Sequence, residues 1–417
     1  MVLSRILPKV GRDGNIIIAA AALRTLDYGF ISVFLGVYLT LLEFSVVQAG
    51  LVFSAIMAGS ALSNTLASWK GDTIGRRRMF IAMSVLMVAG GVAFSLSTDF
   101  IVLLLIGLFA VTTSGGGDRT AFISLDTAVL AENTSSTQRT IAFSWYNLVT
   151  IFTRSLGALL IALPALLQRW SDIGELDSYK LMFAVYAAIA AVGILLYSRL
   201  SPNVEVRKGR QGQGDLTARS EATSARNVIL KMTGLSALDA LGGGFAVRSF
   251  VSFWFVNQFG VDLFGISGIF FAAQLLNVVS VALAAPVAKR IGLVNTMAFT
   301  QIAANMMFIG MAFSFNVWLA VAFFLLHEIC NDMDVPTRQS YTMAIVPPES
   351  RTAMASLNNL GRNVAQTVSP TLAGVIAQVA YLSAPFLVGA VTKLIYNALL
   401  LQMFRGIRPP EEVREEG

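Results

Sequence analysis

The sequence is poor in the residues that build metal and catalytic sites. It has one histidine, His327, and one cysteine, Cys330, among 417 residues. One cysteine cannot form an intrachain disulfide, and one His with one Cys is too few for a typical metal site, so we expect no cofactor. A phosphate-binding loop of the G-x-x-x-x-G-K-[ST] type is missing, and so is a G-x-S-x-G nucleophile elbow. These gaps argue against ATP-driven transport and against an enzyme.

Charged residues are also scarce, at 13% of the chain, whereas soluble domains carry about 25%. Hydrophobic residues make up 55% of the sequence, and the mean hydropathy is +0.69. Apolar runs of roughly 20 residues, the length of a membrane-crossing helix, recur throughout. The first one is too long for the core of a signal peptide. The sequence therefore predicts an all-α polytopic membrane protein whose surroundings are the lipid bilayer.

Twelve membrane spans fit the pattern, joined mostly by short polar loops. We predict them at residues 15–41, 46–69, 79–98, 100–128, 140–166, 180–200, 228–257, 262–288, 293–314, 316–344, 352–376 and 381–404. The longest polar segment, residues 201–227, is rich in Gly and Ser and predicts a flexible linker.

Lysine and arginine fall almost entirely on one side of these spans, and the positive-inside rule makes that side cytoplasmic. The other side holds only Arg169 and Lys180. The rule also accounts for the net charge of +6 without a nucleic-acid partner. We expect a plasma-membrane protein with both termini and the linker in the cytoplasm. The basic residues on the cytoplasmic side are Arg5, Lys9, Arg12, Lys70, Arg76, Arg77, Arg78, Arg139, Arg199, Arg207, Lys208, Arg210, Arg219, Arg226, Lys289, Arg290, Arg351, Arg405, Arg408 and Arg414.

An internal repeat organises the chain. The stretch RTIAFSWYNL at 139–148 recurs as RTAMASLNNL at 351–360, an offset of 351 − 139 = 212. The same offset places Leu26-Asp27 on Leu238-Asp239. Repeats of this kind indicate two copies of one structural unit. We predict an N-terminal six-helix bundle at 1–200, the linker at 201–227 and a C-terminal six-helix bundle at 228–417.

The loop after the second span carries Asp72, Gly75, Arg76 and Arg77 in the spacing of a known motif. With the repeat and the twelve spans, it resembles the major facilitator superfamily. That resemblance implies a fold of two pseudo-symmetric six-helix halves and a loop that gates the cytoplasmic side. We add Asp126, Asp334 and Arg338 to the gate, with salt bridges expected to Arg139, Arg351 or the arginines at 76–78. Ser68 and Thr73 depart from the motif.

Ionisable residues also lie well inside the predicted spans. A charge at the bilayer centre costs about 2.5–3.5 kcal/mol even on the lenient insertion scale, so these groups must pair or line a wet cavity. The resemblance implies that spans 1, 4, 7 and 10 line the cavity, with 2, 5, 8 and 11 beside them, and most of the charges fall on those spans. Lys393 is an exception without an explanation at this stage. The residues predicted to form the proton-coupling and substrate cavity are Arg24, Asp27, Asp118, Arg119, Arg154, Asp239, Arg248, His327, Glu328 and Arg362.

Individual acids suggest different roles. Arg24 lies three residues before Asp27 on one helix face and is expected to neutralise it, so Asp27 should stay ionised, in a site or a structural ion pair. Asp239 and Glu328 have no equally close basic neighbour, and we expect them to carry the coupling proton. His327 has an unperturbed pKa of about 6.5 and fits either a proton site or a polar core.

The pattern favours a monomeric secondary transporter that works by alternating access, couples to protons and moves a small organic solute. Export is slightly favoured. Alternatives are an uptake carrier or uniporter for sugar-like or anionic solutes, whose anionic groups Arg154 and Arg362 would suit, and a receptor or sensor on the same fold. A receptor would typically carry a long folded cytoplasmic domain, which the short linker does not provide. An enzyme within the membrane is disfavoured by the missing catalytic motifs.

Overall fold

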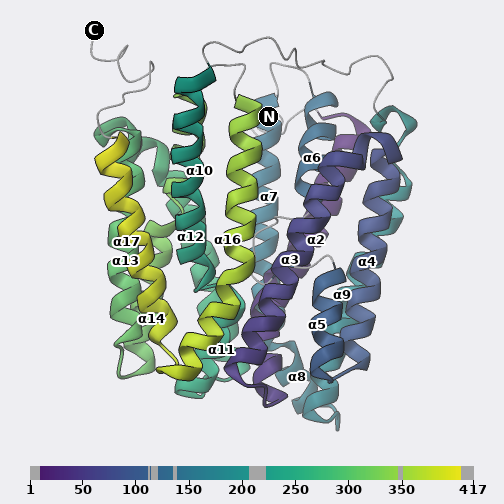
Figure 1. Cartoon of the computed structure of the whole chain (residues 1–417). Coiled ribbons are helices and arrows are strands. Elements are labelled where there is room, and N and C mark those ends of the chain that lie inside the picture. The colour runs from purple at the N-terminus through teal and green to yellow at the C-terminus, as the bar shows by residue number, and fades with distance from the viewer. Residues whose placement is uncertain are drawn as a thin grey trace, which may run out of the picture. The chain divides into compact units, whose positions relative to one another are not determined.

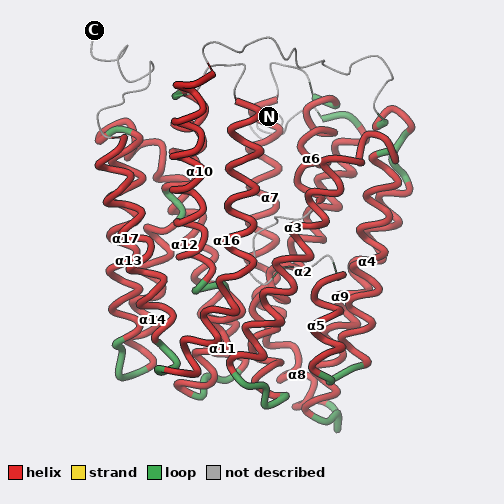
Figure 2. Tube along the Cα trace, viewed as in Figure 1, coloured by secondary structure: helices red, strands yellow, loops and turns green. Residues whose placement is uncertain are grey.

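The computed structural model describes residues 10–110, 113, 121–134, 139–205, 222–345 and 351–404. These residues form helices joined by short loops, and the described part of the chain has no strand (Figure 2). The predicted all-α fold is therefore confirmed. Eight helical segments within these residues are long and apolar enough to cross a bilayer. Many large apolar side chains on them are exposed, as lipid-facing positions require.

The helices, labelled in Figure 1, belong to two compact units. The first unit comprises Met1–Gln211 and Val247–Phe271. Its helices are α2 (Arg12–Leu41), α3 (Val46–Ile74), α4 (Arg76–Leu96), α5 (Phe100–Phe109), α6 (Ala121–Glu132), α7 (Arg139–Leu159), η1 (Leu160–Ala162), α8 (Leu163–Trp170), α9 (Glu175–Ser198), η2 (Pro202–Val204) and α11 (Arg248–Phe259).

The second unit comprises Gly212–Ala246 and Ala272–Gly417. The helix α12 (Leu263–Ile291) runs through the boundary between the two units. Within the second unit, α13 packs against both α14 and α17 (Figure 1). The remaining helices of this unit are α10 (Ala222–Gly244), α13 (Leu293–Ala312), α14 (Val317–Asn331), α15 (Asp334–Ala344), α16 (Arg351–Val379) and α17 (Ala384–Phe404).

The core of the first unit forms around α2, which packs on α7, α9 and α11. Thr25 and Thr153 share a hydrogen bond of 2.7 Å between α2 and α7. The hydroxyl groups of Ser249 and Ser252 donate to the backbone oxygens of Ser32 and Val33, which fixes α11 to α2. Short polar side chains of this kind bond neighbouring membrane helices at close approach.

In the second half of the chain, two predicted spans are each divided into two helices. The span at 228–257 becomes α10 and α11, separated after three glycines by residues 245–247. The span at 316–344 becomes α14 and α15, separated by Asp332 and Met333. Pro336 explains the second break, because it has no N–H to donate to the carbonyl of Asp332, four residues earlier. That carbonyl accepts instead from the backbone N–H of Val335 at 3.3 Å. Residues 332–333 are called the α14–α15 break below.

Candidate functional site

A buried ion pair joins α2 to α6 in the first unit. The Nη2 of Arg24 lies 2.5 Å from Oδ2 of Asp126, and the two side chains are 4% and 0% exposed. Arg24 also donates from Nη1 to the hydroxyl oxygen of Tyr197 at 2.6 Å and lies 4.3 Å from the centre of the Phe122 ring. The hydroxyl of Tyr146 donates to the same Oδ2 at 2.8 Å. The pair is therefore held from α2, α6, α7 and α9.

This arrangement differs from two expectations. Arg24 was expected to neutralise Asp27, its neighbour one turn along α2. It reaches Asp126 instead, because the carboxylate and the Tyr197 hydroxyl together provide two acceptors for its guanidinium group. Asp126 was expected in the cytoplasmic gate, but its described partners, Arg24 and Tyr146, are both buried inside the first unit.

Asp27 is left without a described partner. Its side chain is 0% exposed, and neither carboxyl oxygen has a hydrogen-bonding partner among the described residues. Burying an ionised carboxylate without a partner costs several kcal/mol or more, whereas a protonated carboxyl group carries no charge to compensate. The geometry therefore suits a carboxyl group that gains and loses a proton.

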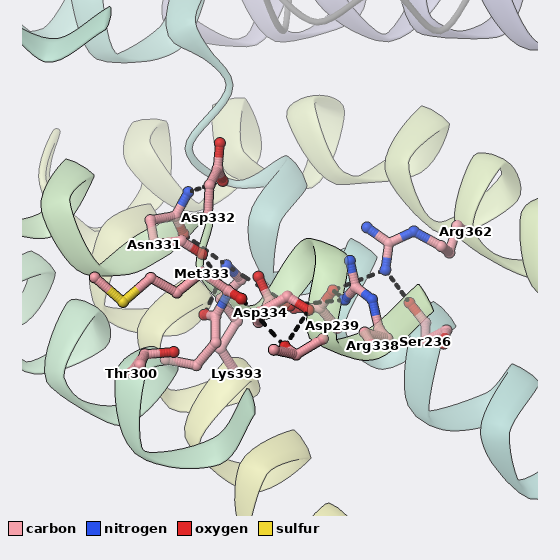
Figure 3. A network of polar contacts seen from close by, with 12 residues as sticks. Ser236, Asp239, Thr300, Asn331, Asp332, Met333, Asp334, Arg338, Arg362 and Lys393 are labelled. Atoms are coloured by element: carbon pink, nitrogen blue, oxygen red, sulfur yellow. Dashed lines mark hydrogen bonds and ion pairs between the residues drawn. The ribbon is translucent and has the colours of Figure 1, made fainter. Parts of the chain in front are cut away.

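The second unit holds a larger polar network centred on Asp239 (Figure 3). Its Oδ2 accepts from Nη1 of Arg338 at 2.6 Å and from Nη1 of Arg362 at 2.8 Å, and Lys393 Nζ lies 3.9 Å from Oδ1. Arg338 also lies 3.1 Å from Oδ2 of Asp334. Asp239, predicted to lack a close basic neighbour, thus has three, contributed by α15, α16 and α17. They were missed because they are distant in sequence.

The network continues from Lys393 to the α14–α15 break. Lys393 Nζ donates to Gln301 Oε1 at 3.3 Å and to Asn331 Oδ1 at 3.4 Å. Asn331 donates to Asp332 Oδ1 at 2.8 Å, and Asn277 of α12 donates to Asp332 Oδ2. Lys393 had no explanation in the sequence, and the structure places it inside this network. The feature of the sequence that singled out Lys393 was its position as an isolated lysine within an apolar span.

In each unit a buried ion pair joins corresponding predicted spans, but the acid and the base have exchanged places. The repeat offset maps Asp126 onto Arg338, since 338 − 126 = 212, and it maps Asp27 onto Asp239. In the first unit the base lies on the first predicted span and the acid on the fourth. In the second unit the acid lies on the first span of the repeat and the base on its fourth. In each unit, a buried ion pair therefore connects the first and the fourth predicted span of that repeat.

The other residues predicted for the cavity are dispersed over both units. His327 is buried, with Nδ1 2.9 Å from the backbone oxygen of Ala304 and its ring against Phe308, which fits the core role considered for it. Glu328 is buried beside it, while Arg154 and Arg248 are half-buried. Asp118 and Arg119 lie outside the described residues.

The predicted gate loop makes its described contacts within the first unit. Gly75 separates α3 from α4 with a φ of +102°, a conformation that favours glycine. The Glu205 carboxylate accepts from the backbone N–H groups of Arg76 and Arg77 at 2.7 and 3.3 Å, which caps α4 with a negative charge. Arg76 Nη1 also pairs with Glu132 Oε2 at 2.8 Å.

Three further gate predictions have different outcomes. The side chain of Asp72 lies outside the described part of the structure. Asp334 and Arg338 were predicted for the gate, and the structure places both in the Asp239 network of the second unit. Their buried positions allow direct pairing with Asp239, which explains the difference.

A family model described as Major Facilitator Superfamily matches residues 17–327 and 306–417. The chain belongs to the Major Facilitator Superfamily. Membership confirms the predicted family and fold class, and it identifies the chain as a membrane transporter rather than an enzyme.

Similar proteins include a membrane protein and several solved transporters. The Saccharomyces cerevisiae protein described as uncharacterized membrane protein YJR124C is 25% identical over 424 residues, covering 95% of each chain. The nucleoside transporter NupG has a TM-score of 0.73 at 12% identity, covering 95% of this chain and 100% of its own. The inward-open xylose transporter XylE from E. coli has a TM-score of 0.70 at 14% identity, with 96% and 99% covered. At these identities the solved structures support the fold alone.

Proposed function

We propose that this transporter is a secondary active carrier that couples the movement of a small organic solute to protons by alternating access. The observation that carries the proposal is Asp27, a fully buried carboxyl group without a described partner. Such a group is most stable when it is protonated inside the unit and can release its proton when the cavity opens to water. Coupling follows if solute binding and proton binding favour the same change of access.

We assign the coupling proton to Asp27, whereas the sequence had suggested Asp239. Asp239 lies against Arg338, Arg362 and Lys393, which compensate its negative charge. Neutralising Asp239 would therefore leave buried cations uncompensated, whereas neutralising Asp27 removes an uncompensated charge. Buried pairs are strongly destabilised when one partner is lost, which favours Asp239 as a permanent anion.

The structural neighbours support a small organic solute. They include a nucleoside transporter, a xylose transporter and a peptide transporter of the POT family. Export is the direction that we propose, on the general resemblance to exporters rather than on a particular residue. We also propose a monomer in the plasma membrane, with both termini and the linker at 201–227 in the cytoplasm between bundles at 1–200 and 228–417.

The test is solute-linked proton movement in liposomes. A thermal-shift screen at two pH values first selects solutes from nucleosides, pentoses and dipeptides. Purified protein is then reconstituted with a pH-sensitive dye inside. Wild type should move protons when the selected solute is added, whereas Asp27→Asn should lose proton movement and keep solute exchange at equal pH.

Asp99→Asn is the matched control, because Asp99 is exposed and caps α5 through a side-chain oxygen that Asn retains. It should behave as wild type. Solute-linked proton movement in Asp27→Asn equal to that of wild type would contradict the assignment of the proton to Asp27. A wild type that exchanges solute without any proton movement would contradict proton coupling itself.

A further inference from the structure

Lys393 is the least expected member of the Asp239 network. It lies on α17, and its ammonium group reaches groups on three other helices: Asp239 on α10, Gln301 on α13 and Asn331 at the end of α14. Its side chain is 13% exposed. A lysine in an apolar helix usually extends its flexible side chain toward water. The Lys393 ammonium group lies inside the unit instead, so its polar partners must offset the cost of burying its charge.

The close packing of α10 against α17 leaves room for the Lys393 side chain to reach Asp239. A Cβ atom on Gly242 would lie 2.7 Å from Cγ of Lys393 and 2.9 Å from the backbone oxygen of Gly389. Only a residue without a side chain fits between these atoms. Gly242 and Gly243 thus let the Lys393 side chain pass along α10 to Asp239.

Asp239 is connected to both sides of the α14–α15 break. On one side, Arg338 of α15 binds its carboxylate directly at 2.6 Å. On the other side, the described link passes through Lys393, which contacts Asp239 and Asn331, the last residue of α14. Removing the ammonium group would leave α15 attached to Asp239 and would release α14 from it.

We propose that Lys393 is a positioning residue of the transport cycle, which holds the end of α14 to Asp239 and so fixes the α14–α15 break. Lys393 and Arg338 hold the two halves of this broken helix to the same carboxylate, so a change in the angle between the halves has to lengthen or break one of these contacts. The inference goes beyond the proposed function, since it requires neither a particular solute nor proton coupling.

The chain provides its own reporter for this inference. Cys330, the only cysteine, lies one residue before Asn331 on α14 and is half-buried. Its rate of reaction with N-ethylmaleimide, followed by intact mass in liposomes, measures how often the end of α14 opens. Lys393→Met removes the ammonium group and should speed the reaction about tenfold, within the usual range of coupling between contacting residues. Lys231→Met makes the same change at an exposed position of α10 and should leave the rate unchanged.

Two further variants separate positioning from simple loss of stability. Lys393→Arg keeps the charge and should react at a rate close to that of wild type. In an Asp239→Asn background, Lys393→Met should add little, because the link is already broken. A wild-type rate in folded Lys393→Met, or an arginine variant as fast as the methionine variant, would overturn the inference. If Lys393→Met does not fold, Lys393→Gln decides: it should react more than twofold faster than wild type, and an unchanged rate would overturn the proposal.

Discussion

Breaking the Arg24–Asp126 pair gives the sharpest test of the buried charges in the first unit. Arg24→Met removes the guanidinium group and leaves Asp126 with the Tyr146 hydroxyl as its described partner. Losing one member of a buried ion pair costs about 3–5 kcal/mol, whereas a hydrogen bond between membrane helices contributes only about 0.6 kcal/mol on average. At 4% and 0% exposure, the larger value applies. We expect Arg24→Met to lower the free energy of unfolding by about 3–5 kcal/mol.

The double variant decides between a charge effect and a packing effect. Arg24→Met with Asp126→Leu replaces the pair with apolar groups of similar size, a change that is often nearly neutral. Tyr146 and Tyr197 then lose an acceptor and a donor, so we expect a loss of about 2 kcal/mol, smaller than that of either single variant. Steric trapping in bicelles measures the free energy of unfolding. Arg199→Met, at an exposed position, is the control and should change it by less than about 0.5 kcal/mol. A double variant less stable than both single variants would refute the reasoning.

Three further predictions concern the side that we propose to be cytoplasmic. Gly75→Ala should destabilise the protein by about 1–3 kcal/mol, because φ is +102° and the new Cβ would lie 2.9 Å from Glu205 Oε2; thermal unfolding with Gly71→Ala as control measures it. Asp72→Asn should fold normally but transport more slowly, and a wild-type flux at equal expression would argue against a gate. Ser220, outside the described residues, should be cytoplasmic: after Ser220→Cys in a Cys330→Ser background, labelling from outside intact cells would contradict the topology.

Helix positions were predictable from the sequence, and helix breaks were only partly so. Membrane spans follow from apolar length because a bilayer leaves no solvent for unpaired backbone groups. Pro286 and Pro370 lie within continuous helices, yet Pro336 follows a break. In α15, Pro336 occupies the first turn, where its missing N–H needs no partner. The break also depends on Gln301 Nε2, which donates to the Asn331 backbone oxygen at 2.9 Å, a contact that sequence spacing does not show.

The partners of the buried charges were the part that local sequence reasoning missed, and the repeat shows why. Arg24 was matched to Asp27 because they are three residues apart, but the shortest described ion pairs join residues separated by about 100 positions: 102 for Arg24–Asp126 and 99 for Asp239–Arg338. Asp126 and Arg338 occupy equivalent positions at the offset of 212, but their charges are opposite. Each pairs with the first span of its own repeat. Those two first spans must therefore carry opposite charges as well. Arg24 and Asp239 meet that requirement, whereas Asp27 does not. Once the structure shows that Arg338 pairs with Asp239, the repeat points Asp126 to a base on the first span, and Arg24 is the base there.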